Sequence, residues 1–493
     1  MAPPLASRYT LSIDALRTPR LNLATATALA CAAVGLAVRA YVAFHDDGIF
    51  WPDEIYQSLE PAHRLAFGYG LVPWEFIEGA RNWALPGLLG GWLWLVSHLG
   101  LPHPAQYLGA TRLLFLGLAA LGGYGTYRLA LAAGAQAGAA ALAAGASLLQ
   151  VLGLYFSHRA MSENASAAVA VLGLAFTLAP QASRRALWLG ASLLGLAVLL
   201  RLQCAVFAAV ALAVLAARRE KVAALHVGGV LGLWAFLFGL LDRLTWHDAP
   251  GARFGGWFHS AVKYLEFNLT QDGAARWGTS PWDFYVSRLW HTMPATIAVL
   301  AVLLVLAAPR ARGLFAVALV FFALHSWTGH KEIRFLVPLL PVAFALAAVG
   351  LDALTAPRAR LALRLALVGA CAFSAARFPQ LTFGDLGAYL DRPSASAWDD
   401  FGPVNRLLLA AHQRDDLCGL RVDVHPAWMG GSTYLHRDAP LYPPGSPPQT
   451  GFFNYAIVHA GSGLPPLAHE GDLELVQVRP DCVANPGYSW RLP

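Results

Sequence analysis

The most informative residues of the chain are an acidic pair inside an aromatic stretch, Trp51-Pro-Asp-Glu54. Pro52 suits the first turn of a helix, and the positive end of the helix dipole favours ionised carboxylates at Asp53 and Glu54. First-turn acids often do no more than cap a helix. Here, however, several tryptophan, tyrosine and phenylalanine residues surround the pair, as is typical of a membrane–water interface. Because an ionised carboxylate at such a surface can act as a general base, both acids are catalytic candidates.

A second group of ionisable residues, His330-Lys-Glu-Ile-Arg334, lies between two apolar runs. Four ionisable residues in five positions are costly at a membrane boundary unless they pair with one another or bind an anion. Arg and Lys form charge-assisted hydrogen bonds with phosphate, so the pattern favours a phosphate site over an exposed loop with internal ion pairs. The candidate ligands are His330, Lys331, Glu332 and Arg334.

Isolated polar residues at the ends of other apolar runs extend this set. Each of Arg81, Arg159 and Arg201 lies next to a run of apolar residues. Any one of them could simply extend its charged head to the lipid headgroups. Together they predict a polar cavity at one face of the membrane. The chain shows no P-loop and no cysteine–histidine spacing of the kind that binds a metal.

The elements that must position these residues are membrane helices. Of the 493 residues, 57% are hydrophobic and only 13% are charged, whereas soluble domains carry about 25% charged residues. Many windows of roughly 20 residues are apolar enough to span a bilayer. The predicted fold is a mostly α, polytopic membrane domain over residues 1–377 with 11 to 13 spans, including polar loops at 45–82 and 242–290. The run 83–100 is short, contains Gly90-Gly91, and is either a span or a re-entrant or interfacial segment.

The C-terminal part, 378–493, is predicted to be a small soluble α/β domain. A helical pattern covers 404–412, and strand patterns cover 420–424, 455–458 and 473–478. Cys418 and Cys482, the only cysteines of this part, each flank a strand pattern. If the domain lies in an oxidising compartment, they are candidates for a disulfide.

The arginines predict the orientation of the chain. Arg8, Arg17 and Arg20 precede the first apolar run, and other arginines fill short gaps between later runs, at 184–185, 218–219, 310–312 and 358–364. Cytoplasmic loops are enriched in such residues. Both polar loops, residues 330–334 and the C-terminal domain are therefore expected on the non-cytoplasmic face. The net charge of +6 reflects these spread arginines, and nucleic acid is not an expected partner. The Arg-rich, Lys-poor composition suggests a bacterial chain, hence an inner membrane and a periplasmic site.

Three stretches, 51–63, Trp74-Glu-Phe76 with Arg81-Asn82, and 330–336, together resemble glycosyltransferase family 22. These are the polyprenyl-phosphate-mannose-dependent α-mannosyltransferases of N-glycan and GPI-anchor assembly, which have the GT-C membrane fold. The family's His-Pro-Asp-Glu…Gln…Leu-Glu-Pro-Ala-His motif is similar to residues 51–63. Its His-Lys-Glu-Glu-Arg-Phe motif is similar to 330–335, and its Gly-Thr-x-Pro-Trp-x-x-Tyr segment to 278–285. Trp51 replaces the family's His, and Ile333 replaces an acid. The resemblance covers residues 23 to about 350.

The resemblance implies transfer of a hexose, most simply mannose, with inversion from a polyprenyl-phosphate-sugar donor to a hydroxyl of a glycan or glycolipid. Asp53 would deprotonate that hydroxyl, and fixed cations would stabilise the lipid phosphate that leaves. The implied substrate- and phosphate-binding residues are Glu60, His63, Trp74, Glu75, Arg81, Arg159, Arg201, His330, Lys331, Glu332 and Arg334. No cofactor or obligatory metal is implied, although an Asp–Glu pair could bind a divalent cation. A different donor sugar is one alternative. A lipid or glycan transporter is another, but the inverted repeats of many transporters are not evident.

Overall fold

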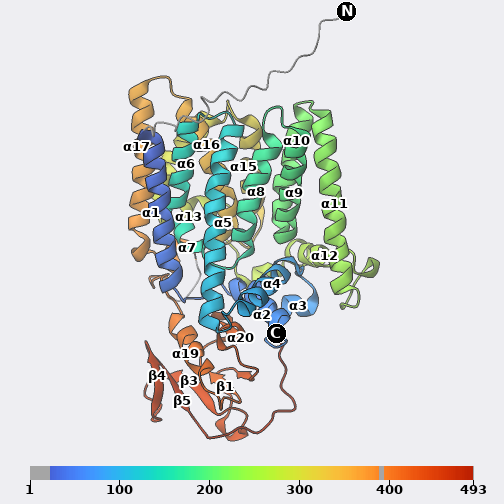
Figure 1. The fold of residues 1–493 in the computed structure, drawn as a ribbon, viewed down its shortest axis with the longest axis vertical. Coiled ribbons are helices and arrows are strands. Elements are labelled where there is room, and N and C mark those ends of the chain that lie inside the picture. The colour runs from blue at the N-terminus through green and yellow to red at the C-terminus, as the bar shows by residue number, and fades with distance from the viewer. Residues whose placement is uncertain (1–22, 388–392, 492–493) are drawn as a thin grey trace, which may run out of the picture.

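The structure, a computed structural model, describes residues 23–387 and 393–491. A helical bundle forms most of the molecule, and a small α/β domain lies against one end of it (Figure 1). The predicted fold class, a mostly helical membrane protein with a C-terminal α/β part, is therefore confirmed. Arg8, Arg17 and Arg20, which served to orient the first helix, lie outside the described residues.

Apolar helices run along the bundle. Those long and apolar enough to cross a membrane are α1 (Leu23–His45), α5 (Pro104–Ala132), α11 (Lys221–Trp246), α16 (Leu340–Asp352) with the turn from Ile333 that precedes it, and α17 (Pro357–Ala376). The shorter helices of the bundle are α6 (Ala137–Leu149), α8 (Ser162–Leu178), α9 (Arg184–Leu200), α10 (Ala205–Ala217), α14 (Pro294–Ala307) and α15 (Arg312–Trp327). The span number of 11 to 13 stays a prediction.

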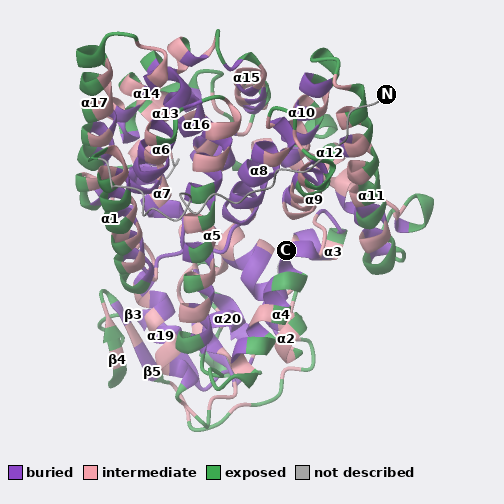
Figure 2. Cartoon of the chain, turned by 45° about the horizontal axis from the view of Figure 1, so that its top comes forward, coloured by how far each residue is buried: buried purple, intermediate pink, exposed green. Residues whose placement is uncertain are grey.

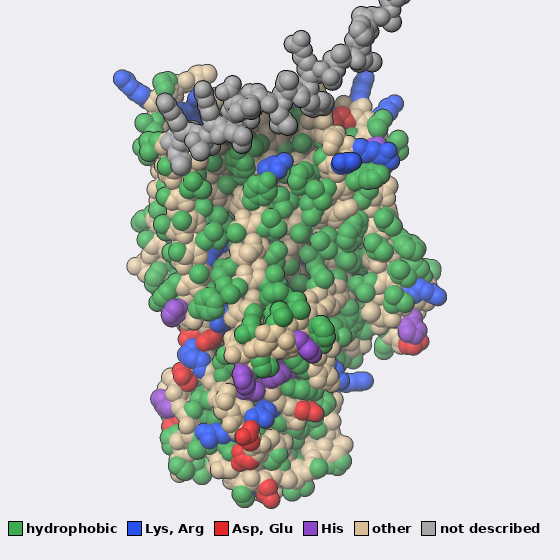
Figure 3. All heavy atoms as spheres, in the orientation of Figure 1, with side chains coloured by type: hydrophobic (Ala, Val, Ile, Leu, Met, Phe, Trp, Pro, Cys, Tyr) green, Lys and Arg blue, Asp and Glu red, His purple; other side chains and the backbone are tan. Residues whose placement is uncertain are grey.

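The burial pattern of the bundle suits a lipid surrounding. Helix α8 is buried along nearly its whole length and forms the centre (Figure 2). The outer helix α11 instead exposes large apolar side chains, among them Leu225 and Leu233, which are 75% and 56% exposed. Hydrophobic side chains cover the visible side of the bundle (Figure 3). Exposed apolar surface on this scale marks contact with a membrane.

The end of the bundle away from the α/β domain carries the arginine-rich connections. Arg310 Nη2 donates to the carbonyl of Ala353 over 3.1 Å, and Arg218 Nη1 donates to the carbonyl of Leu178 over 3.2 Å. These contacts bring together the connections at 179–183, 218–220, 308–311 and 353–356. Lys and Arg side chains gather at this end in Figure 3.

Short helices occupy the opposite end, next to the α/β domain. They are α2 (Glu60–Phe67), α3 (Trp74–Glu78), α4 (Ala84–His98), α7 (Val151–Phe156), α12 (His259–Leu265) and α13 (Phe284–Thr292). Helix α4 lies within the short apolar run 83–100, for which the sequence left a span and a re-entrant or interfacial segment open. It lies beside α2 at this end (Figure 1), buries Leu89 and Leu93, and exposes Leu88 and Trp94. Its position beside α2 favours the re-entrant or interfacial interpretation of this run over a span.

The C-terminal part, hereafter the tail (393–491), combines helices α19 (Gly402–His412) and α20 (Gly431–Leu435) with a five-stranded sheet of order β2-β1-β3-β5-β4. Strand β1 pairs in parallel with β2 and β3, whereas β5 runs antiparallel to β3 and β4. The strands are β1 (Leu420–Val422), β2 (Leu441–Tyr442), β3 (Tyr455–His459), β4 (Pro466–Glu470) and β5 (Leu473–Gln477).

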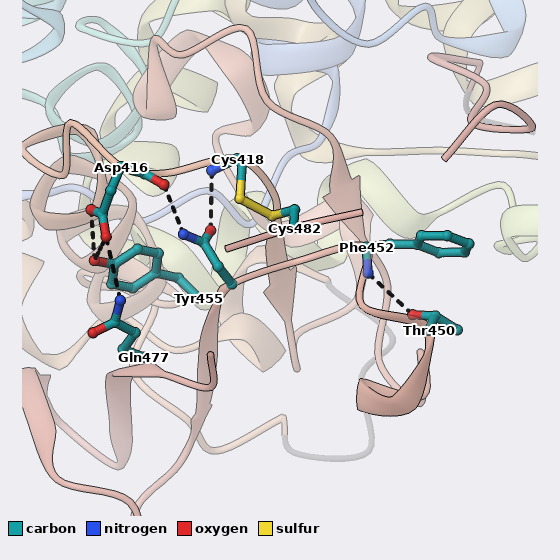
Figure 4. Close-up of a disulfide and its surroundings, with 8 residues drawn as sticks. Asp416, Cys418, Thr450, Phe452, Tyr455, Gln477 and Cys482 are labelled. Atoms are coloured by element: carbon teal, nitrogen blue, oxygen red, sulfur yellow. Dashed lines mark hydrogen bonds between the residues drawn. A yellow bond between two sulfur atoms is a disulfide. The ribbon is translucent and has the colours of Figure 1, made fainter. Parts of the chain in front are cut away.

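Two features tie the tail together and join it to the bundle. Cys418 and Cys482 form a disulfide across the sheet margin, with Cα atoms 5.9 Å apart (Figure 4). The chain just before the tail packs inward, since Phe378 and Phe383 share an apolar core with Phe156 of α7. The residues at the predicted domain boundary therefore belong to the packing of the bundle.

Candidate active site

The segment that carries the acidic pair, hereafter the carboxylate segment (46–60), connects α1 to α2. Pro52 opens a helical turn, because Tyr56 N donates to its carbonyl over 2.8 Å. Asp53 and Glu54 form the first turn, as the sequence predicts, and a π-helical turn follows from Ile55 to Leu59. A single π-turn inside a helix costs stability and is frequent at functional sites.

Arg334 is the centre of the ionic network around Asp53. Its Nη2 lies 2.5 Å from Asp53 Oδ2, its Nη1 lies 2.8 Å from Glu163 Oε1, and its Nε lies 2.6 Å from Glu332 Oε2. The guanidinium also lies over the ring of Trp51. One cation thus holds three carboxylates from three distant parts of the chain, and the fork geometry of Arg makes this possible.

Arg201 continues the network but is incompletely bonded. Its Nη1 lies 2.9 Å from Glu163 Oε1 and 3.1 Å from Ser162 Oγ. Within the described part of the chain, its Nε and Nη2 are buried and lack a hydrogen-bond partner. Buried polar groups almost always have a partner, and a charged group more so. The two unmatched donors therefore indicate a place for an anionic ligand.

A partly open cavity of about 50 Å³ adjoins Arg201. Its walls come from the carboxylate segment, the chain before α4, the start of α8 and helices α11 and α12. The polar lining residues are Gln57, Ser58, Arg81, Asn82, Ser162, Arg201, Ser260 and Tyr264. Arg81 lies over the ring of Tyr264, so it stands at the cavity without a carboxylate directly against it among the described ion pairs.

Glu75 stands behind the cavity wall. Gln57 Nε2 donates to its Oε1 over 3.0 Å, and Gln57 itself lines the cavity. Burial raises the pKa of Glu75 to about 7, and the nearby charge of Asp53 acts in the same direction against that of Arg81. Near neutral pH this acid is partly protonated, which reduces the negative charge beside the cavity.

The loop 328–334, hereafter the basic loop, is held by its own neighbours. Lys331 Nζ donates to the carbonyl of Ser280 over 2.7 Å and to that of Thr328 over 2.5 Å, so its ammonium group faces backbone oxygens. His330 Nε2 lies 2.9 Å from Glu332 Oε1. Burial alone would raise the pKa of Glu332, but the charge of Arg334 and the hydrogen bond with His330 outweigh it and hold that pKa at about 2. Burial disfavours the protonated form of His330, but the hydrogen bond with Glu332 and the charge of Glu332 outweigh burial and raise the pKa of His330 above its ordinary value.

Arg159 holds the other acid of the pair. Its Nη1 donates to Glu54 Oε2 over 3.1 Å and to the carbonyl of Gly48 over 2.7 Å, and its Nη2 donates to Asp46 Oδ2 over 2.8 Å. Burial raises the pKa of Glu54 despite the charge of Arg159. Asp53 and Glu54 therefore turn to different arginines, and their carboxylates do not converge on one point.

Three other predicted residues contact partners far along the chain. Glu60 accepts hydrogen bonds from the tail residues Ser432 and Thr433, and His63 Nε2 lies 2.9 Å from His436 Nδ1. Trp74 stacks on Trp277, with ring centroids 6.1 Å apart. Sequence reasoning placed all three with the substrate, but partners 200 to 370 residues away decide where they face.

Two residues of the network were not among the predicted site residues. Glu163 joins Arg201 to Arg334, and Asp46 pairs with Arg159. Asp46 stands two residues after the apolar run that ends at Phe44, and Glu163 lies near the start of the apolar run that ends at Leu178. An acid at the boundary of an apolar run was the available signal in each case.

Comparisons with known proteins show the family and the fold of the chain. A model of the Alg9-like mannosyltransferase family matches residues 32–383. The chain is 28% identical over 333 residues to mannosyltransferase APTG1 of Arabidopsis thaliana, covering 62% of this chain and 56% of that protein. It is 31% identical over 305 residues to GPI mannosyltransferase 3 of Yarrowia lipolytica, covering 59% and 56%. The matched stretch thus spans little more than half of these relatives.

Solved structures share the fold at low identity. ArnT from Cupriavidus metallidurans, bound to undecaprenyl phosphate, has a TM-score of 0.58 and 15% identity, covering 92% of this chain and 98% of that one. The oligosaccharyltransferase of Archaeoglobus fulgidus, tethered to an acceptor peptide, has a TM-score of 0.54 and 12% identity, covering 88% and 69%. The predicted GT-C membrane fold is confirmed.

Proposed function

Because this chain belongs to the Alg9-like mannosyltransferase family, we propose that it transfers mannose from a polyprenyl-phosphate-linked donor to a hydroxyl of a glycan or glycolipid, with inversion. The observation that carries this proposal is the pair of unmatched, buried donors on Arg201 at the wall of a polar cavity. The ion network of Glu163 and Arg334 links that arginine to Asp53. A site for a phosphate and a carboxylate base therefore lie within one cluster.

Asp53 is the best placed general base of the cluster. Its side chain is 22% exposed, whereas those of Glu332 and Glu163 are 14% and 1% exposed. Arg334 contacts Oδ2 and fixes the orientation of the carboxylate. As the acceptor oxygen attacks the anomeric carbon, its proton passes to Asp53 and the bond from that carbon to the phosphate oxygen breaks.

Arg201 and Arg81 are the better candidates for the leaving phosphate. Both residues line the cavity, and the buried Nε and Nη2 of Arg201 have no hydrogen-bond partner among the described residues. Lys331 and Arg159, which the resemblance also suggested, direct their terminal nitrogens to backbone carbonyls or to carboxylates of the chain. Fixed cations at the point where negative charge develops lower the barrier, because they need no reorganisation during the reaction.

The site is proposed to face away from the cytoplasm, and in a bacterial inner membrane toward the periplasm. The arginine-rich connections lie at the opposite end of the bundle, which supports this orientation through the bias of cytoplasmic loops. Single cysteines at Ser280 and Ser446 should react with a membrane-impermeant reagent in spheroplasts. Cysteine at Ser183, on the arginine-rich end, should react only after lysis; the reverse pattern would overturn the orientation.

The function is tested with purified protein in lipid nanodiscs, supplied with polyprenyl-phosphate-[³H]mannose and a lipid extract as the acceptor pool. We expect labelled mannose in the acceptor fraction and release of polyprenyl phosphate. Parallel assays with glucose, galactose and aminoarabinose donors test the alternative sugars. Reaction with one of those alone would keep the fold and change the donor. Movement of intact donor across a vesicle membrane without cleavage would instead indicate a transporter.

A further inference from the structure

Glu60 stands at the start of α2 with its carboxylate buried against the tail. Its Oε1 accepts from Leu71 N over 2.8 Å and from Ser432 N over 3.0 Å. Its Oε2 accepts from Thr433 N over 2.9 Å and from Thr433 Oγ1 over 2.7 Å. Four donors on one buried carboxylate, three of them from the tail, make a strong and directional joint.

The backbone of the tail is shaped for this joint. Gly431 has a φ of 55°, and a Cβ atom there would lie 2.9 Å from Glu60 Oε2. Glycine permits both the left-handed conformation and the close approach. Nearby, Tyr56 of the π-turn donates from its hydroxyl to the carbonyl of Met429 over 3.1 Å. The tail therefore contacts the carboxylate segment on the C-terminal side of Asp53 at two places.

The tail also holds the N-terminal side of the same segment. Asp47 N donates to Asp399 Oδ1 over 2.9 Å, and Ile49 N donates to the carbonyl of Asp400 over 3.0 Å. Asn405 connects the two sides, because its amide donates to the carbonyl of Asp47 over 2.6 Å and accepts from Gly430 N over 2.8 Å. Asn405 is fully buried.

Asp53 lies between these two sets of contacts. Helical turns run without interruption from Asp53 through the π-turn and into α2. Glu60 lies seven positions after Asp53, a rise of roughly 10 Å or about two turns. A joint at Glu60 therefore fixes both the axial position and the rotation of the turn that presents the carboxylate.

We propose that the tail is a positioning element of the active site, which acts through Glu60 to hold the Asp53 carboxylate in its reactive place. The proposal rests on the function assigned to Asp53 above. It differs from a purely stabilising role, because it predicts a loss of catalytic rate that depends on Asp53. Small displacements of a catalytic group are costly even when the substitution lies away from the chemistry.

The test uses a graded series of variants of the full chain in nanodiscs. Glu60→Gln replaces two of four acceptor positions with an NH₂ that faces N–H and O–H donors. Thr433→Val removes one hydrogen bond and keeps the shape, so it retains the fold if Glu60→Gln does not. Glu474→Gln, on strand β5, is the matched control, since no described hydrogen bond or ion pair joins Glu474 to the carboxylate segment.

We expect Glu60→Gln to lower kcat by about tenfold or more and Thr433→Val by about threefold, with the KM for the donor within about twofold of wild type. Glu474→Gln should match wild type. In the background of Asp53→Asn, Glu60→Gln should cost less than about a further twofold, because both changes act on one group. Amide exchange of residues 53–60 should accelerate in Glu60→Gln, while that of α8 stays unchanged.

Two results would overturn the proposal. An unchanged kcat in both Glu60→Gln and Thr433→Val would leave the tail without influence on the reaction. The same loss from Glu60→Gln with and without Asp53 would show that Glu60 acts elsewhere. Failure of the proposed function looks different, because wild type would then not transfer mannose, or Asp53→Asn would be fully active. In that case the amide exchange of residues 53–60 still tests the contact: an unchanged exchange rate in Glu60→Gln would show that Glu60 does not hold this segment in place.

Discussion

Arg159 and Arg201 lie at the same end of the bundle, and both are buried, at 1% and 4% exposure. Arg159 directs both terminal nitrogens to Asp46, Glu54 and the carbonyl of Gly48. The Nε of each arginine has no partner among the described residues, but Arg201 uses only Nη1 and leaves Nη2 unmatched as well. We call the surroundings of Arg159 and Glu60 the anchored side, and those of Arg201, Arg81 and Gln57 the cavity side.

The comparison teaches that residue type and burial do not reveal the role of a cation. A buried charge needs compensation, and on the anchored side the chain supplies it. On the cavity side the chain supplies only part of it, so the remainder is left for a substrate. Acceptors within the protein make an arginine a positioning group, and missing acceptors make it a binding group.

The largest expected effect is on the turnover rate, and it concerns Asp53, where the anchored side and the cavity side meet. Asp53→Asn should lower turnover by at least about a hundredfold, the scale of a lost general base. The variant should remain folded, since Arg334 keeps Glu163 and Glu332 as partners. Steady-state rates with radiolabelled donor provide the measurement, and Asp283→Asn, an exposed acid before α13, is the control. Turnover near that of wild type would remove Asp53 from the mechanism.

We expect loss of Arg159 to lower the stability of the protein more than loss of Arg201, whereas loss of Arg201 should weaken ligand binding more. Arg159→Gln leaves the buried Asp46 and Glu54 carboxylates without their cation, and breaking a buried pair in this way costs about 3–5 kcal/mol. Arg201→Gln should cost much less, because Arg334 still pairs with Glu163. Thermal unfolding of the two variants in detergent makes the comparison. Equal losses of stability would show that the anchored and cavity sides do not differ as described.

The anchored side depends on a folded tail, which the disulfide stabilises. The bond joins residues 64 positions apart, and closure of such a loop stabilises by about 4 kcal/mol in the chain-entropy description. The Cys418→Ser, Cys482→Ser double variant should unfold at a lower temperature and keep its rate per molecule at low temperature. Reductant should destabilise wild type and leave the variant unchanged. A rate loss at low temperature would give the disulfide a role beyond stability.

The smallest effect concerns pH at the joint of α2 with the tail. Burial lowers the pKa of His63 to about 4 and that of His436 to about 3, from an ordinary value near 6.5. Between these values the unfolded chain binds protons that the folded chain does not, so stability falls as the pH drops from about 6.5 toward 4.

Burial also raises the pKa of Glu60, which makes the folded protein more stable as the pH falls, opposite to the effect of the histidines. Because Glu60 is present in both wild type and His436→Asn, the difference between their pH profiles isolates the contribution of the histidines. Asparagine tolerates the positive φ of 43° at position 436. Between pH 7 and pH 5 the unfolding temperature of wild type should fall more steeply than that of the variant. Parallel pH profiles would separate these histidines from the stability of the joint.

Composition and local pattern predicted most of the fold. The helix at 404–412 and the strands at 455–458 and 473–478 appear within a residue or two of their predicted bounds, because alternation and turn residues are local signals. The placement of α4 was not decided by sequence. Its run is apolar but short, so a span and an interfacial segment were both open, and its packing on α2 and the tail sets it outside the bundle.

The sequence indicated several residues that do come together in the structure, but it did not indicate which partners each of them contacts. Asp53, Arg201 and Arg334 do meet, through Glu163. Lys331 was expected to bind phosphate but faces carbonyls, and Glu60 faces the tail. Such roles depend on hydrogen-bond partners that lie far along the chain, 372 and 373 residues away in the case of Glu60. No local pattern contains that information.

The central claim, that the unmatched donors of Arg201 bind the lipid phosphate, is tested most directly by equilibrium binding of undecaprenyl phosphate to the purified protein. Loss of two charge-assisted hydrogen bonds in Arg201→Gln should weaken binding by about tenfold or more. Arg185→Gln, an exposed arginine at the opposite end of the bundle, should bind as wild type does. An Arg201→Gln variant that is folded and binds undecaprenyl phosphate with wild-type affinity would contradict the account.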